Sequence, residues 1–153
     1  MPTHRHPALG TIVKCNYDRG FVPPEMVKAR LAVIVSPPIQ ARPRLCTVVP
    51  LSTTPPVPRM PYHTEINVPF ELPRKWEAAR RWVKADMTCA VSFDRVDLLS
   101  IGKDKSGKRI YQMESLPRED IVRIQKAILA SLGLARLAKH LAVPQTRELE
   151  AQK

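Results

Sequence analysis

The residues of this chain that could do chemistry are hydroxyl, carboxylate and guanidinium groups beside apolar segments. Glu25 and Arg30 precede the apolar run 31–35, and Ser52 and Thr53 follow the apolar run 45–51. A guanidinium stays charged and can hold two phosphate oxygens at once, and a hydroxyl can bind and orient a phosphate oxygen. The set therefore suits the binding of a phosphate group. For Ser52 and Thr53, a turn that ends the strand is the structural alternative, and it is compatible with phosphate binding.

Patterns for other kinds of site are absent from the sequence. His4 and His6 are close together, but a loose N-terminal arm lacks the fixed geometry of a zinc site. Cys15, Cys46 and Cys89 lie far apart inside apolar stretches and form no C-x-x-C pair, so we expect three buried, reduced thiols. No glycine pattern for phosphate loops and no G-x-S-x-G motif occurs. We expect no metal and no cofactor.

The charge of the chain indicates a polyanionic partner. Lys and Arg total 25 against 14 Asp and Glu, which gives a net charge of +11. Residues 1–60 carry 8 basic and 2 acidic side chains (+6), so the strongest positive field lies on the N-terminal third, which also holds the hydroxyl and proline motifs. Such an excess most often recruits nucleic acid, although a passive basic surface is the alternative. The N-terminus lacks the apolar region of a signal peptide, and the longest apolar run, 31–35, is too short for a bilayer. We therefore expect a cytoplasmic protein with no membrane contact.

Short apolar runs separated by turn residues predict a set of strands. We expect strands at 11–17, 31–35, 45–51, 64–68, 82–89, 91–99 and 109–113, and a short helix at 73–81 that begins with a proline. Acidic Glu119 and Asp120 after Pro117 announce a C-terminal helix. Its apolar face is formed by residues at helical spacing, namely Ile121, Ile124, Ile128 and Leu132. Gly133 can end or kink this helix, and 134–141 can form another turn or two.

Many strands followed by one or two helices predict an α+β fold built on a small curled sheet or barrel. A chain of 153 residues fits one domain. We expect residues 1–8 to form a flexible arm, 9–141 a single domain and 142–153 a frayed tail.

In the order and spacing of several short motifs, the chain resembles the PemK/MazF family of toxins. No motif is decisive alone; the ordered set is specific, and it consists of Gly10-Thr11-Ile12-Val13, Glu25 with Arg30, the 32–36 strand, Val48-Val49-Pro50-Leu51-Ser52-Thr53, Trp82-Val83-Lys84-Ala85-Asp86, Asp94-Arg95-Val96 and the 116–132 helix. The resemblance covers residues 9–134. It implies an SH3-like β-barrel with a C-terminal helix, usually as a homodimer, that cuts single-stranded RNA and is neutralised by an acidic antitoxin.

The resemblance also assigns catalytic roles. Metal-free RNA cleavage uses the neighbouring 2′-oxygen as nucleophile, so the protein must move protons and stabilise a phosphorane with extra negative charge. Arg30 matches the family's functional arginine and suits that stabilisation. Ser52 and Thr53 would orient the phosphate, and Glu25 would act as base or orient Arg30. Two positions depart from the family pattern, since Ser52 replaces a threonine and Leu31 replaces a proline.

Five further residues are candidates for binding RNA: Lys28, His63, Lys84, Asp86 and Arg95. Asp86 matches a family aspartate and would read a base edge or form a structural pair with Arg95. Lys84 stands where some relatives carry arginine and would be a point charge for phosphate. His63 would be a proton shuttle, and a surface role is the alternative. Trp76 and Trp82 could stack on bases, but core packing is the more common role of tryptophan.

Two other functions fit the same sequence. Gyrase-poisoning toxins share this barrel and bind a protein target, and a non-catalytic barrel could bind nucleic acid through the +11 charge alone. The combination of Arg30 with the Ser52 and Thr53 hydroxyls favours RNA cleavage, because a gyrase poison does not need these groups.

Overall fold

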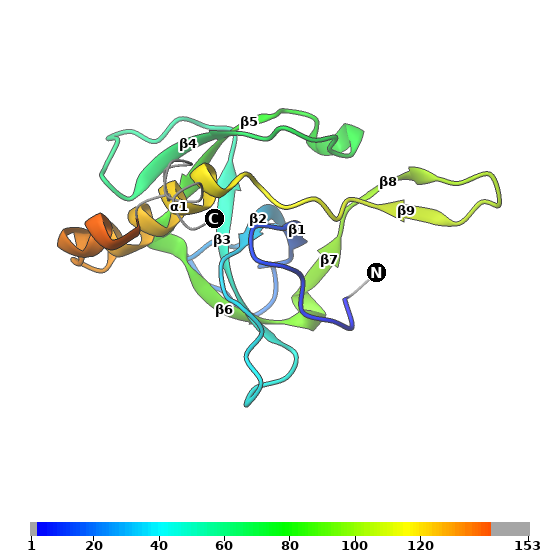
Figure 1. Cartoon of the computed structure of the whole chain (residues 1–153), viewed down its shortest axis with the longest axis horizontal. Helices are drawn as coiled ribbons and strands as arrows, with labels where there is room; N and C mark the ends of the chain where they lie inside the picture. Colours follow the sequence, from blue (N-terminus) through cyan, green and yellow to red (C-terminus); the bar gives the residue numbers. More distant parts are fainter. Residues whose placement is uncertain (1–2, 142–153) are drawn as a thin grey trace, which may run out of the picture.

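The computed structural model of the chain describes residues 3–141 as an α+β fold, in which a curled antiparallel sheet packs against one α-helix (Figure 1). The nine strands are β1 Ile12–Cys15, β2 Arg30–Ile34, β3 Leu45–Ser52, β4 His63–Asn67, β5 Arg80–Lys84, β6 Cys89–Ser92, β7 Val96–Leu98, β8 Ser100–Lys103 and β9 Arg109–Tyr111. The helix is α1, Arg118–Ser131, and the short 3₁₀ turns are η1 Arg74–Trp76, η2 Ala85–Met87, η3 Phe93–Arg95 and η4 Ala135–Leu141.

The main sheet has the strand order β4-β5-β3-β2-β1-β7. The long strand β3 pairs with β6 at its first half, Leu45 to Val48, and with β5 at its last two residues. β6, which pairs with β3, leads through η3 into β7, which pairs with β1. The segment from β6 to β7 therefore links β3 to β1, but η3 interrupts its ladder of hydrogen bonds. The predicted α+β class is confirmed, and the sheet curls without closing through hydrogen bonds.

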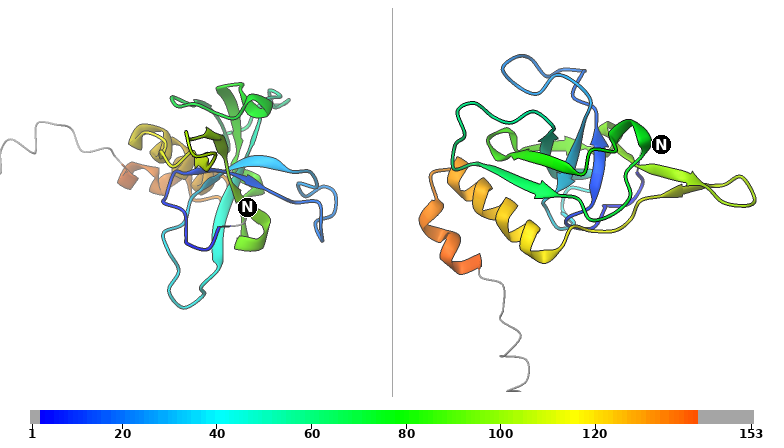
Figure 2. Two further views of the ribbon diagram at one scale, coloured as in Figure 1. Left: turned by 90° about the vertical axis from the view of Figure 1, so that its right-hand side faces the viewer. Right: turned by 90° about the horizontal axis from the view of Figure 1, so that it is seen from above.

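The sheet is buried on both faces. In β2, Leu31 and Val33 belong to one apolar cluster, while Ala32 and Ile34 belong to the other, as the alternation of side chains along a strand requires. α1 covers the first cluster through Ile124, which is 1% exposed. Figure 2 shows α1 along one side of the sheet, with the β8–β9 hairpin projecting away from the body.

The predicted C-terminal helix is confirmed, with a shorter apolar face than expected. Ile121 and Ile128 pack against the core beside Ile124, but Leu132 lies past the last helical residue and is 66% exposed. Gly133 takes a φ of 72° directly after it, a conformation that suits glycine, and η4 follows.

The predicted helix at 73–81 is wrong. Only η1 forms there, closed by the Trp76 N–H donating to the Pro73 carbonyl at 2.6 Å. The Val68 N–H donates to the Ala79 carbonyl, so the β4–β5 ladder already begins at Ala79 and draws the chain into the sheet. The strands expected at 82–89 and 91–99 exist only in part, because η2 and η3 interrupt them.

At the N-terminal end, Thr3 is buried and its N–H donates to the Val96 carbonyl at 3.3 Å. The predicted tail 142–153 lies outside the described residues, and the division into arm, domain and tail stays a prediction. Among residues 3–141, no helix is long and apolar enough to cross a membrane.

Candidate active site

A cleft of about 280 Å³ lies where β2 begins and β3 ends. It is lined by Arg30, Leu51, Ser52, Thr53, Arg74, Lys75, Trp76, Glu77, Ala78 and Arg81. The structure thus brings three of the four predicted catalytic residues, Arg30, Ser52 and Thr53, to one place. It adds three cationic side chains that the sequence analysis did not select, at positions 74, 75 and 81.

The pairing of β3 with β5 builds this cleft. Leu51 lies opposite Val83 and Ser52 opposite Trp82, so the end of β3 pairs with the middle of β5. The Oγ of Ser52 accepts the N–H of Thr54 at 3.1 Å, which is the turn predicted for a strand end. This contact uses an acceptor site of Ser52, and the structure shows no acceptor for its proton in the described range, so the hydroxyl can donate to a ligand.

Two arginine side chains line the cleft with hydrogen-bond donors left over. The Nε of half-buried Arg30 and the Nε of buried Arg81 are both shielded from solvent and have no hydrogen-bond partner. Arg81 donates from Nη2 to the Trp76 carbonyl at 2.7 Å, and its burial lowers the pKa of its guanidinium. Glu77 is the one acidic residue in the lining, against four cationic ones. The charge and the free donors of the cleft therefore suit an anion.

Glu25, predicted to act as base or to orient Arg30, does not line the cleft. It lines a separate pocket of about 470 Å³ that is also lined by Asp86, Phe21 and Cys89. Its Oε2 accepts the N–H of Val22 at 2.7 Å, which fixes the carboxylate within its own loop. Glu25 and Asp86 are thus neighbours, and neither of them lines the cleft of Arg30.

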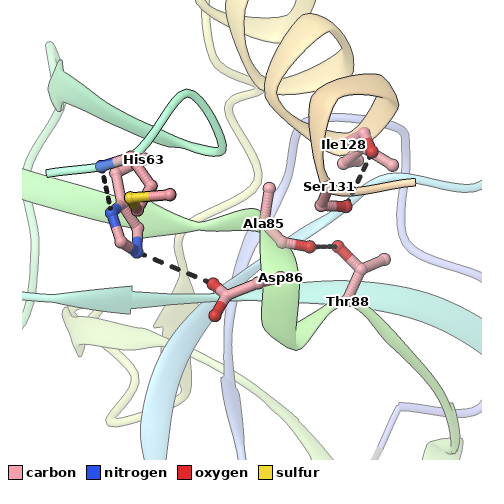
Figure 3. Close-up of polar contacts among 7 residues, drawn as sticks. His63, Ala85, Asp86, Thr88, Ile128 and Ser131 are labelled. Carbon is pink, nitrogen blue, oxygen red and sulfur yellow. Dashed lines mark hydrogen bonds and ion pairs between the residues drawn. The ribbon is translucent and has the colours of Figure 1, made fainter. Parts of the chain in front are cut away.

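His63 contacts Asp86, as Figure 3 shows. The Nε2 of His63 lies 3.8 Å from the Oδ1 of Asp86, and its Nδ1 accepts the N–H of Met60 at 3.1 Å. Because Nδ1 is an acceptor, a neutral ring carries its proton on Nε2, facing the carboxylate. Lys84 lies opposite His63 in the β4–β5 ladder. Three candidates for RNA binding, His63, Lys84 and Asp86, therefore come together at this end of the sheet.

The other two RNA-binding candidates lie apart from these. Arg95 donates to the Asn16 carbonyl at 3.2 Å, and its guanidinium lies 4.9 Å from the ring centre of Phe21. The suggested pair of Arg95 with Asp86 does not occur among the ion pairs of the described residues. Lys28 is exposed in the loop before β2. The placements of all these residues leave their roles as predictions.

The three cysteines are free; Cys15 and Cys46 are buried and Cys89 is half-buried. Burial raises the pKa of Cys15 to about 12 and that of Cys46 to about 11, and it also raises the pKa of Cys89. None of them is a thiolate at neutral pH, so none suits nucleophilic catalysis. Within residues 3–141, no group of three or more His, Cys, Asp or Glu side chains could hold a metal ion.

Residues 8–132 match the family described as PemK-like, MazF-like toxin of type II toxin-antitoxin system. The chain is 31% identical to the uncharacterized protein YifN of Escherichia coli (strain K12), over 87% of this chain and 96% of that protein. It is 30% identical to an uncharacterized protein of Haemophilus influenzae, over 88% of this chain and 94% of that protein.

Two solved structures are similar in fold. MazF from Deinococcus radiodurans gives a TM-score of 0.56 at 18% identity, over 83% of this chain and 96% of that one. An endoribonuclease from a mycobacterial species, solved in complex with its cognate antitoxin, gives 0.53 at 20% identity, over 84% and 97%. The resemblance seen in the sequence is confirmed.

Proposed function

This chain belongs to the PemK-like, MazF-like family of toxins of type II toxin-antitoxin systems, and from that premise we propose that it is a metal-independent endoribonuclease that cuts single-stranded RNA at selected sequences. One observation carries the proposal: Arg30 lines a single cationic cleft together with Ser52 and Thr53, which lie at the end of a different strand. Such a cleft combines a permanent charge with hydroxyl donors, which is the chemistry that a phosphodiester needs.

In the proposed reaction the 2′-oxygen of the RNA loses its proton and forms a bond to the adjacent phosphorus. The bond from phosphorus to the 5′-oxygen of the next nucleotide then breaks, and that oxygen takes up a proton. The products are a 2′,3′-cyclic phosphate and a free 5′-hydroxyl. Arg30 would stabilise the charge that develops on the phosphate oxygens, and Ser52 would orient one of them by donating its hydroxyl proton.

Glu25 remains the proposed base. Because it lines a separate pocket, this role requires a movement of the loop between β1 and β2 that brings its carboxylate to the cleft. Glu77 already lines the cleft and is the alternative. Cleavage by Glu25→Gln and Glu77→Gln variants separates the two, because removal of the true base lowers the rate on the order of 100-fold or more.

The proposed partners are single-stranded RNA, a second copy of the chain and an acidic antitoxin, in the cytoplasm. The mycobacterial endoribonuclease was solved with its cognate antitoxin, which supports a partner of this type. Lys28, Lys84, Asp86, Arg95 and His63 are the proposed contacts to RNA outside the cleft.

Incubation of the purified chain with a mixed RNA in the presence of EDTA tests the function. We expect cleavage, products with a 5′-hydroxyl and no cleavage of DNA of the same sequence, because the nucleophile is the substrate's own 2′-oxygen. Products with a 5′-phosphate, or activity only with added magnesium, would contradict the mechanism. Tight RNA binding without cleavage would indicate a non-catalytic barrel, and inhibition of gyrase without any effect on RNA would indicate the other class of toxin.

A further inference from the structure

Arg81 is a cationic residue at a core-facing position of the sheet. Along β5 the side chains alternate, so Arg81 shares a face with Val83, and it lies opposite Ile66 on β4. Arg81 is 3% exposed, while Val83 and Ile66 are 0% and 1% exposed. Burial of a charge in such surroundings lowers stability unless a partner compensates it.

The fold compensates Arg81 only in part. Nη2 donates to the Trp76 carbonyl at 2.7 Å, but the buried Nε has no partner. No carboxylate lies within ion-pair distance of it in the described part of the chain. The residue before it in the strand, Arg80, is exposed and forms an ion pair with Glu65. Exposed Arg80, which water can solvate, thus has a carboxylate partner among the described residues, whereas buried Arg81 has none.

The same cleft holds a second group of this kind, the unpartnered Nε of Arg30. We infer that Arg81 is a second phosphate-binding residue, whose guanidinium binds an RNA phosphate in the cleft beside Arg30. The contact to Trp76 holds the guanidinium in place before the phosphate arrives, so little conformational freedom is lost on binding. The identity of the ligand as RNA rests on the proposed function, whereas the ability to bind a phosphate anion does not.

Inorganic phosphate is the probe that tests the site directly. The Nε–Hε resonances of the arginines are followed by NMR in the full chain during a phosphate titration, and the Arg81→Lys and Arg30→Lys variants assign them. We expect both resonances to shift and to saturate together. A charge-assisted hydrogen bond of this kind contributes about tenfold or more to affinity, so Arg81→Met should weaken phosphate binding by at least that factor. An Arg81 resonance that does not respond to saturating phosphate would overturn the inference.

Arg80→Met is the matched control, because it removes an arginine of the same strand from the exposed face. It should leave phosphate affinity unchanged, and an equal loss in both variants would mean that only net charge matters. If Arg81→Met does not fold, the titration of the wild-type chain still decides. A second titration uses RNA with a 2′-O-methyl group at the cleavage site. There, Arg81→Met should raise Kd by a similar factor, and RNA affinity equal to that of the wild type would refute the role in substrate binding.

Failure of the proposed function would look different from failure of this inference. If the chain cuts no RNA but binds phosphate through Arg81, the proposed function is refuted and the phosphate site is kept. If the chain cuts RNA and the Arg81→Met variant has the KM and kcat of the wild type, the proposed function stands and the role of Arg81 is refuted.

Discussion

Replacement of Arg30 by Met should separate activity from stability. Arg30 takes part in no ion pair among the described residues, and its buried Nε has no partner, so the substitution removes no hydrogen bond from that atom. We expect the free energy of unfolding to stay within about 1 kcal/mol of the wild type or to rise, because an unsatisfied buried donor is lost. Removal of a preorganised charge from the reaction should lower the cleavage rate on the order of 100-fold or more, which corresponds to about 2.7 kcal/mol of transition-state stabilisation.

The assay pairs single-turnover cleavage of an RNA oligonucleotide with urea unfolding of the same preparation. Arg80→Met serves as the control: it breaks the exposed pair with Glu65, should cost at most about 1 kcal/mol and should cut RNA at the wild-type rate. A folded Arg30→Met protein that cuts RNA normally would remove Arg30 from the site. A loss of more than about 3 kcal/mol in stability would show instead that the guanidinium supports the fold, against the reasoning above.

Three further outcomes are expected. Ile124→Ala should lower the free energy of unfolding by about 2–5 kcal/mol in urea titrations, because Ile124 is 1% exposed, whereas Leu132→Ala, at a residue that is 66% exposed, should stay within about 0.5 kcal/mol. Because burial raises the pKa of Cys15 to about 12 from an ordinary value of 9.0, the unfolded chain loses this thiol proton first; stability should fall as pH rises from 9 towards 12, and less steeply in Cys15→Ala. An acidic antitoxin and an uncleavable RNA should compete for the cleft of Arg30, and simultaneous binding at full affinity in a fluorescence assay would place the inhibitor elsewhere.

The part of the site that lies at strand ends could be predicted from the sequence. Arg30 stands directly before the apolar run of β2, and Ser52 ends β3, so both could be placed at the edge of a sheet without knowledge of the topology. The structure adds that these two edges face one cleft. That step depends on which strands pair, and sequence periodicity does not give the pairing.

The predicted helix over 73–81 conceals Arg81, because it includes this residue. A helix over 73–81 makes Arg81 one more solvated charge beside Arg80. In a strand, the same residue is two positions from buried Val83 and must face the core with it. The two-residue spacing of Arg81 and Val83 is the signal in the sequence that indicates a buried Arg81. Glu25 illustrates a different limit, since four residues of loop separate it from Arg30 and no local rule fixes the direction of its side chain.

The unpartnered donors of the cleft connect the proposed substrate with the proposed control. A folded chain that buries guanidinium nitrogens without acceptors is less stable than one in which these nitrogens have hydrogen-bond partners. An anion that binds both Arg30 and Arg81 therefore gains this difference in free energy on binding. An RNA phosphate meets this requirement, and so does a carboxylate of an acidic peptide. Selection between the two ligands must then come from outside the cleft. We propose that the pocket lined by Phe21, Met26 and Cys89, with Glu25 and Asp86 among them, provides such contacts, because its two carboxylates would repel a further acid and would accept hydrogen bonds from a base edge.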